Sequence, residues 1–393
     1  MLPSPARSSR NRPRRAPPGP AGPASYAGPT RTTTEKPLMT ARHTAAALIT
    51  FADTLLQQTG LDADKAIAVA EILVEGDLMG HDTHGLNLLG PYLNELTNHT
   101  MGKSGGPVVM NQRPAAQLWD GQRLPGPWLV LEAMDKCADM AKIYGSGSIS
   151  IRRSHHIAAL TAYLKRATDQ GLMMLLYCSD ANSCSVAPHG GREPVFTPNP
   201  MAFGIPTGGA PILVDVSCSI TTNGMSGRLA KEGKKFPAKW LLDDKGEATD
   251  DPKYGTPGGG GTIQLLGGMD VGHKGYGLTL LVEALTGGLA AFGRADPKQG
   301  WGATVFVQLL DPEAFGGLAG EARQMDFVAD ACRRSAPRAD FQRAGIDKVR
   351  LPGERALKVR AEQLRDGVKL HEGIMPQLVP WAQKLGIALP AAS

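Results

Sequence analysis

Residues 154–206 restrict the possible folds more than any other stretch of the chain. They begin with a segment whose apolar residues recur at helical spacing: Ile157, Leu160, Leu164 and Ala167. Gly171 can end that helix in a left-handed conformation. Residues 172–178 are then continuously apolar, which is typical of a strand buried on both faces. A helix followed at once by a buried strand predicts an α/β fold.

The loop that follows this strand is rich in residues that fix or free the backbone: Pro188, Gly190, Gly191, Pro194, Pro198 and Pro200. Such segments often bring backbone amides to a ligand. His155 and His156 fall at the start of the predicted helix, where free backbone N–H groups can meet an anion. The stretch therefore predicts a binding site.

Further strands are predicted at 116–119, 148–151, 212–216 and 305–309, with a helix over 131–145. A chain of 393 residues has room for two or three domains. No G-x-G-x-x-G motif follows any of these strands. An ordinary Rossmann dinucleotide site is therefore not supported.

A dense polar cluster, His81-Asp82-Thr83-His84-Gly85, separates two predicted helices near the N-terminus. Two imidazoles, a carboxylate and a hydroxyl offer proton-transfer chemistry. The same residues can also cap helices, with Asp82 or Thr83 accepting backbone N–H bonds. The residues alone leave both interpretations open.

Residues 272–277, Gly-His-Lys-Gly-Tyr-Gly, lead directly into an apolar predicted helix. Lys274 beside small residues at a helix N-terminus can hold a phosphate or a carboxylate. The alternative is a solvated lysine in a turn. The five glycines of residues 255–261 indicate a mobile loop, because glycine content alone does not make a phosphate site.

The net charge of +5 comes from the N-terminus. Residues 1–38 carry seven Lys and Arg against one Glu, a net of +6, so the remaining residues sum to −1. Nine of the 30 prolines also lie there, which predicts a disordered basic tail. Four interpretations of this tail are open. It can be a dispensable extension, translated sequence upstream of a true start at Met39, a transit peptide, or a basic arm that touches nucleic acid. We expect no nucleic-acid partner.

Five scattered cysteines with no C-x-x-C spacing predict free thiols and a cytoplasmic location. No stretch approaches the roughly 20 uninterrupted apolar residues of a membrane span, so no membrane partner is expected.

Six blocks, in order along the chain, resemble the type 2 malate/L-lactate dehydrogenase family of NAD(P)-dependent oxidoreductases. They are GHDTHG (80–85), SHHIAAL (154–160), VAPHGGREPVFTPNPMAFGIP (186–206), ILVDVSCS (212–219), GHKGYGLTLLVEAL (272–285) and LPGER (351–355). Members of this family act on malate, lactate, sulfolactate, ureidoglycolate or the cyclic imine piperideine-2-carboxylate.

The resemblance implies a non-Rossmann α/β (α+β) fold and a homodimer. The cofactor domain, residues 115–270, would hold a mixed, largely antiparallel sheet. A helical N-terminal part, residues 39–114, would carry the acid/base cluster. Residues 271–393 would pack with those N-terminal helices, and residues 1–38 would remain a tail.

The resemblance also assigns catalytic roles to three residues. Thr83 would orient His84, and His84 would donate a proton to the substrate carbonyl oxygen or imine nitrogen as hydride arrives. Other members assign that proton to the histidine matching His156. Both assignments are kept, because imidazole suits either role near neutral pH.

The implied ligand positions fall in two groups. The NAD or NADP cofactor would be lined by His156, Ile157, Ala158, Ala159, Leu160, Asp180, Val214, Asp215, Val216, Ser219, Lys274, Gly275, Gly353, Glu354 and Arg355. The substrate pocket would be lined by Asn87, Leu88, Pro188, His189, Gly190 and Gly191. No metal site is expected, and His155 is expected to lie behind the site or at the surface.

Two departures from the family pattern affect the substrate. Many members carry an arginine where this chain has Leu88, and an Asp or Lys where it has Met225. An arginine there can hold a substrate carboxylate with two hydrogen bonds. Arg152, Arg153 and Asn87 are candidates to replace it.

The function expected from the resemblance is reversible hydride transfer between NAD(P)H and a small 2-oxo acid, with a 2-hydroxy acid as product. The alternatives are a catalytically impaired NAD(P)-binding homologue and a reductase of a cyclic imino acid. A metal hydrolase using the histidines is disfavoured, because neither H-E-x-x-H nor a tight carboxylate-plus-histidine spacing occurs.

Overall fold

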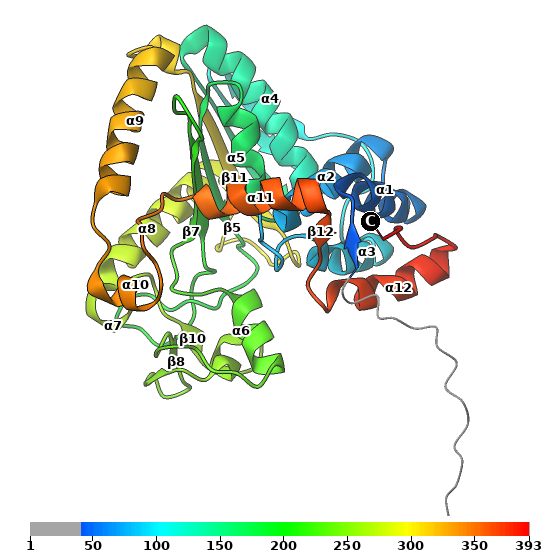
Figure 1. The fold of residues 1–393 in the computed structure, drawn as a ribbon. Helices are drawn as coiled ribbons and strands as arrows, with labels where there is room; N and C mark the ends of the chain where they lie inside the picture. The colour runs from blue at the N-terminus through cyan, green and yellow to red at the C-terminus, as the bar shows by residue number, and fades with distance from the viewer. Residues whose placement is uncertain (1–40, 393) are drawn as a thin grey trace, which may run out of the picture. The chain divides into compact units, whose positions relative to one another are not determined.

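A seven-stranded sheet runs through the computed structural model, which describes residues 41–392 (Figure 1). The strand order is β2-β3-β4-β11-β5-β6-β7, and only the β3–β4 pair is parallel. The strands are β2 (Val108–Arg113), β3 (Ala116–Asp120), β4 (Ser146–Ser154), β5 (Met173–Ser179), β6 (Pro200–Ile205), β7 (Ile212–Ser217) and β11 (Ala303–Leu310). The expected mixed, largely antiparallel sheet is thus confirmed. The predicted disorder of residues 1–38 lies outside the described residues.

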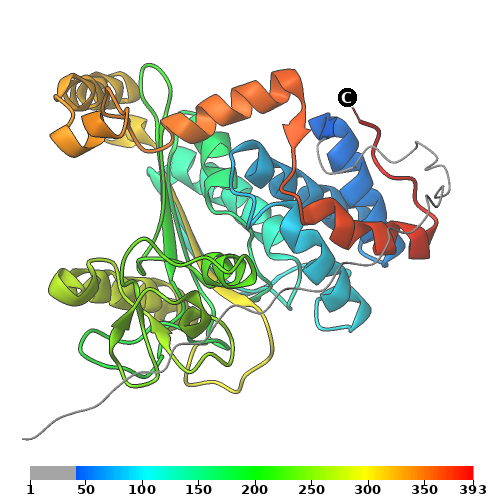
Figure 2. The same ribbon diagram turned by 60° about the horizontal axis from the view of Figure 1, so that its bottom comes forward.

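β5 lies inside this sheet, between β11 and β6, and helices cover both faces of its continuous apolar run. Leu176 on one face joins the main core, together with residues of α4 (Gly126–Tyr144) and α5 (Thr161–Thr168). Tyr177 on the other face packs with Val282 of α8 (His273–Glu283). In Figure 2 the sheet is seen nearly edge-on between these helices.

A helical part is built from both ends of the described chain. Its helices are α1 (Ala45–Gln58), α2 (Ala63–Leu78), α3 (Leu89–Thr97), α11 (Glu354–Asp366) and α12 (Ile374–Leu385). A two-stranded ribbon joins the ends, because β1 (Arg42–His43) pairs with β12 (Val368–Lys369). Figures 1 and 2 both show the first helices beside the last ones. This confirms the prediction of a helical part from both chain ends.

A small lobe with its own apolar cluster lies beyond β7. It contains α6 (Asn223–Lys231) and a three-stranded sheet, β10 (Thr262–Ile263), β8 (Leu241–Leu242) and β9 (Ala248–Thr249). Buried Phe236, Leu241 and Ile263 form the cluster with Val186 and Phe196 of the Pro-rich loop. This packing orders the loop.

Several local predictions differ from the structure. The helix expected from about residue 154 begins only at Thr161, because β4 continues to Ser154, where it pairs with Ala303. His155 and His156 therefore lie in a connection, not at a helix N-terminus. β6 was not predicted, because it begins within the Pro-rich block.

The other elements are α7 (Gly268–Val271), α9 (Leu318–Arg334), α10 (Ala339–Arg343), η2 (Leu86–Leu88), η3 (Pro252–Gly255), η4 (Ala284–Gly288) and η5 (Pro312–Ala314). The described residues, 41–392, belong to one compact unit. The boundaries predicted at 114 and 270 stay predictions, although β11, from the proposed C-terminal part, lies within the sheet. No helix within residues 41–392 is both long and apolar enough to cross a bilayer.

Candidate functional site

The His81–Gly85 segment connects α2 to η2. The Thr83 hydroxyl lies 2.8 Å from Nδ1 of His84. Asp82 does not cap a helix in this segment; its carboxylate pairs with Arg228 of α6 at 3.0 Å. These contacts leave Thr83 and His84 as a hydroxyl–imidazole pair, which favours the proton-transfer interpretation of the cluster over helix capping.

The buried carboxyl group of Asp77 contacts the backbone of this segment. Asp77 accepts a 2.7 Å hydrogen bond from the Leu86 amide, and its second oxygen has no hydrogen-bond partner within residues 41–392. A Cβ at position 85 would overlap the Asp77 carboxyl group, which explains the glycine there. Burial, with a smaller contribution from Asp82, raises the pKa of Asp77 from 3.8 to about 8.

We expect Asp77→Asn to remove a pH dependence of stability. The pKa of Asp77 is higher in the folded protein than in the unfolded chain. The stability that its bound proton contributes is therefore fully present below pH 3.8 and is lost as the pH rises towards 8. Because the folded protein holds one proton more than the unfolded chain in this range, the free energy of unfolding falls by up to about 1.4 kcal/mol per pH unit. Urea unfolding at about pH 6 and about pH 8 would measure it. The exposed Asp169→Asn variant should keep the native slope, and an unchanged slope in Asp77→Asn would contradict the expectation.

His156 is held by three groups. Its Nδ1 atom lies 2.9 Å from the Tyr92 hydroxyl and accepts a 3.2 Å hydrogen bond from the Ala158 amide. The Trp301 ring packs on the imidazole with ring centroids 4.9 Å apart. His155 is fully buried beside it and contacts Glu95 at 3.3 Å, so it lies behind His156 and not at the surface.

The structure brings His84 and His156 together from separate segments. Their ring centroids are 5.9 Å apart and the rings are nearly parallel, at 24°; we call them the imidazole pair. Burial lowers the pKa of His84 from 6.5 to about 4, and burial together with nearby His84 lowers the pKa of His156 well below its usual value. Both shifts favour the neutral form of the ring. Two neutral imidazoles can donate hydrogen bonds and exchange protons.

Nine of the predicted cofactor residues lie on edge strand β7, just after it, or in the two segments whose glycines, Gly275 and Gly353, contact its ends. We call this set the β7 band. Gly353 packs against Leu213 at the start of the strand, and Pro352 accepts the Leu213 amide hydrogen bond. The Asp215 carboxylate accepts a 2.9 Å bond from the Thr161 amide, directly after the His156–Leu160 segment. The band comprises Val214, Asp215, Val216, Ser219, Lys274, Gly275, Gly353, Glu354 and Arg355.

The far end of the band has features that fit a phosphate group. Gly275 packs on the carbonyl of Cys218, just past β7, and a Cβ there would overlap backbone atoms of Leu266. Lys274 is exposed in the first turn of α8, where backbone N–H groups lack partners within the helix. A lysine and a helix N-terminus together attract an anion.

Other predicted residues lie elsewhere. Asp180 follows β5 and accepts hydrogen bonds from Asn182, whose side chain accepts the amide of Gln299 near Trp301. His189 is exposed and lies against His273, with ring centroids 5.8 Å apart. Pro188, Gly190 and Gly191 share its turn, in which the Gly191 amide donates to Pro188. This turn is at the start of α8, and no contact between His189 and the imidazole pair is seen among the described residues.

The proposed replacements for a carboxylate-binding arginine are occupied. Arg152 and Arg153 both pair with the buried Asp120 carboxylate, at 3.0 Å and 2.7 Å. Asn87 accepts hydrogen bonds from Gln377 of α12. The hypothesis that either arginine binds substrate is thus unsupported. Leu88 is partly buried against the core, and Met225 is exposed in the first turn of α6.

Three residues around His156 were not predicted as functional: Tyr92, Gly126 and Trp301. Tyr92 has helical core spacing, Gly126 begins α4, and Trp301 lies in a Gly-rich turn. A Cβ at Gly126 would overlap the backbone carbonyl oxygens of His155 and His156. In the sequence, the only signal for these three residues was the adjacent pair His155-His156, because each of the three is far from that pair along the chain.

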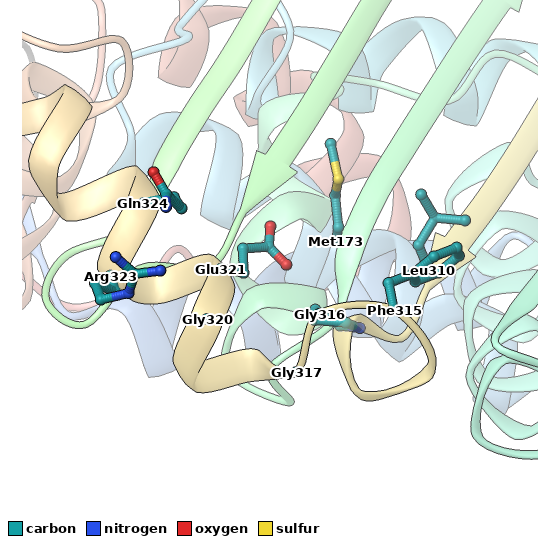
Figure 3. A pocket seen from close by; sticks show the side chains of 10 residues that line it. Met173, Leu310, Phe315, Gly316, Gly317, Gly320, Glu321, Arg323 and Gln324 are labelled. Atoms are coloured by element: carbon teal, nitrogen blue, oxygen red, sulfur yellow. The ribbon is translucent and has the colours of Figure 1, made fainter.

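A cavity of about 520 Å³ opens at the base of α9, lined by Met173, Leu310 and Phe315 among others (Figure 3). Met173 and Leu310 pair at one end of the β5–β11 ladder. His155 and His156 follow Ser154, which pairs with Ala303 at the other end of β11. This cavity therefore lies away from the imidazole pair.

Comparison with known proteins adds family information to this geometry. A family model described as malate/L-lactate dehydrogenase matches residues 43–379. The chain is 28% identical over 345 residues to an L-lactate dehydrogenase of Cupriavidus necator, covering 86% of this chain and 96% of the relative. It is 29% identical over 330 residues to a Δ1-pyrroline-2-carboxylate/Δ1-piperideine-2-carboxylate reductase of Pseudomonas syringae pv. tomato, covering 81% and 90%.

The fold is shared with a solved structure. A crystal structure of malate dehydrogenase from Entamoeba histolytica superposes with a TM-score of 0.83 at 23% identity. The match covers 90% of this chain and all of that one. At this identity the likeness concerns the fold alone.

Proposed function

The chain belongs to the malate/L-lactate dehydrogenase family, and on that premise we propose that it transfers a hydride between NAD or NADP and a small 2-oxo or 2-hydroxy acid. The observation that carries this proposal is the imidazole pair, two rings from separate segments whose centroids are 5.9 Å apart. The His156–Leu160 segment joins the pair to the β7 band, where Asp215 accepts the Thr161 amide. Acid/base groups thus lie beside the residues proposed to hold the cofactor.

The residues of the chain would bind the cofactor, orient the substrate and move one proton. The β7 band would hold the cofactor, with Lys274 and the α8 N-terminus at its phosphates. The nicotinamide, when bound, supplies or accepts the hydride. One imidazole of the pair would exchange the proton with the substrate oxygen, and Thr83 would orient His84 for that exchange.

A substrate panel tests this proposal. The protein would be incubated with NADH and with NADPH and the 2-oxo acids that correspond to lactate, malate and sulfolactate, while the absorbance of the reduced nicotinamide is followed. We expect oxidation with at least one acid. Cofactor binding without turnover on any compound would favour the impaired homologue, the alternative motivated by the departures at Leu88 and Met225. Absence of cofactor binding would remove the proposal.

A second candidate function is reduction of a cyclic imino acid. It is favoured by the 29% identity to the named pyrroline/piperideine-2-carboxylate reductase. A neutral imidazole can serve an imine nitrogen as well as a carbonyl oxygen. Adding Δ1-piperideine-2-carboxylate to the panel separates the two functions, because kcat/KM ranks the substrates directly.

We further propose a homodimer that covers the exposed face of α8. This helix buries Gly275, Thr279 and Val282 but leaves Leu280 and Leu281 each 47% exposed. Leucines exposed together on one helix are typical of an interface.

We expect Leu281→Glu to convert a dimer to a monomer in sedimentation velocity. Burying an unpaired carboxylate at an interface is strongly unfavourable. Ile143→Glu, at a 71% exposed position of α4, is the matched control and should remain dimeric. A monomeric native protein, or a dimeric Leu281→Glu, would contradict the proposal.

The cytoplasmic location also stays a proposal. It is supported by the five cysteines, all of which are free.

A further inference from the structure

The hydrogen bonds to His156 determine which of its ring nitrogens carries the proton. The Ala158 amide donates to Nδ1 at 3.2 Å. A backbone N–H can only donate, so Nδ1 must present its lone pair. In the neutral ring the proton is therefore on Nε2. Protonating Nδ1 would place an N–H against the Ala158 N–H, so the cationic ring is disfavoured at this position.

Tyr92 contacts the same residue at two atoms. Its hydroxyl lies 2.9 Å from Nδ1 and 3.0 Å from the His156 carbonyl oxygen, and its side chain is fully buried. Because Nδ1 presents a lone pair, the hydroxyl hydrogen is directed to acceptors of His156 only. Tyr92 thus restrains both the ring and the backbone of this histidine.

The surrounding structure supports this arrangement. Ala158 has φ of 60°, a left-handed conformation that a non-glycine residue adopts at some cost. Such strain is typical of positions with a functional constraint, and here it accompanies the amide donated to Nδ1. Trp301 packs on the ring at 4.9 Å and limits its movement.

The Nδ1 atom of His84 faces a hydroxyl group, whereas that of His156 faces both a hydroxyl group and a backbone N–H. Among the described residues the Nδ1 atom of His84 has one hydrogen-bond partner, the Thr83 hydroxyl, which can donate or accept. When His84 is cationic, Nδ1–H donates to the Thr83 oxygen and Nε2–H is free to leave. After that proton passes to the substrate oxygen, neutral His84 keeps its Nδ1–H bond to Thr83. Within residues 41–392 no hydrogen-bond donor opposes either state at Nδ1, and the cost of the cationic state comes from burial, which lowers the pKa of His84.

We propose that Tyr92 is a positioning residue that, together with the Ala158 amide, keeps His156 neutral with its proton on Nε2. His156 then donates a hydrogen bond from Nε2 to the substrate oxygen, while His84 gives or takes the proton. The proposal rests on the proposed function for this division of labour. In the reductive direction the carbonyl carbon gains the hydride, the oxygen gains the proton of cationic His84, and His84 becomes neutral.

Two tyrosine variants test the proposal. Tyr92→Phe removes the hydroxyl near Nδ1. Tyr163→Phe is the matched control, because Tyr163 is also fully buried and its hydroxyl donates to the Ile157 carbonyl, at 2.6 Å, one residue beyond His156. Each variant loses one buried hydroxyl that donates to a backbone carbonyl of residues 156–157, but only the first loses a contact with the imidazole.

The first readout is independent of activity. In protein labelled with ¹⁵N-histidine, the His156 ring signals, identified by their absence in His156→Gln, should show the proton on Nε2 and should not titrate in the native protein. Tyr92→Phe should retain the proton on Nε2, because the Ala158 amide remains, but its Nδ1 signal should move because the hydroxyl no longer contacts that atom. Tyr163→Phe should match the native spectrum. A native ring with its proton on Nδ1, or identical spectra for the two variants, would overturn the proposal even if no substrate were found.

The second readout is kinetic. We expect Tyr92→Phe to lower kcat about tenfold, the effect of one lost hydrogen bond, with KM little changed. Tyr163→Phe should retain native kcat if the effect comes from the ring. Equal losses in both variants would indicate a merely structural role for Tyr92.

Discussion

His84→Ala is expected to lower kcat for hydride transfer by about 10²–10⁴-fold, the range of one general acid. His84 is the ring of the imidazole pair whose Nδ1 partner, the Thr83 hydroxyl, accommodates both protonation states. Cofactor affinity should remain nearly native, because the β7 band does not include His84. Stopped-flow absorbance would measure kcat, and titration of reduced-nicotinamide fluorescence would measure binding.

Controls separate the lost proton from a disturbed fold. His371→Ala removes an exposed imidazole from the C-terminal region and should leave kcat unchanged. Thr83→Val should reduce kcat less than His84→Ala, because the imidazole remains but loses its orienting hydroxyl. Native turnover in both His84→Ala and His156→Ala would refute the proposed role of the imidazole pair.

Gly126→Ala is expected to lower both stability and activity. A Cβ at this first residue of α4 would overlap the carbonyl oxygens of His155 and His156, so the backbone must move. Overpacking of this kind costs about 1–3 kcal/mol. Displacing a catalytic ring by about 1 Å can lower turnover about 100-fold. Thermal unfolding and the substrate assay would measure the two effects.

The matched control is Gly320→Ala. Gly320 also lies in the first turn of a long helix, α9, but a Cβ there meets no atom within 4 Å. Alanine should therefore leave kcat unchanged and stabilise the helix by about 0.5–1 kcal/mol. If Gly126→Ala behaved in the same way, the close contact with the His155–His156 backbone would have no energetic consequence.

The sequence predicts those elements whose signals are local. The buried strand at 172–178 became β5, and the glycine at 145 ends α4 with φ of 81°. The resemblance supplied the largely antiparallel sheet, which no local pattern could reveal. β11 lies between β4 and β5, although it is more than 120 residues from either in the chain.

The candidate site was predictable only in part, for a related reason. His84 and His156 could be singled out because each lies in a polar block of unusual composition. The prediction that a helix begins near His156 was wrong, because β4 continues to Ser154 through its pairing with β11. Tyr92 and Trp301 look like ordinary core residues in the sequence, and their contacts with His156 depend on tertiary packing.

The ribbon between β1 and β12 has a consequence for synthesis on the ribosome. The Asp77–Asn87 region, which carries His84, is contacted by the last helices, since Gln363 donates to the Asp77 carbonyl and Gln377 to Asn87. A nascent chain makes α1–α3 first but cannot complete their packing until α12 has emerged. We therefore expect premature termination before α12 to yield a protein that retains the sheet but cannot catalyse.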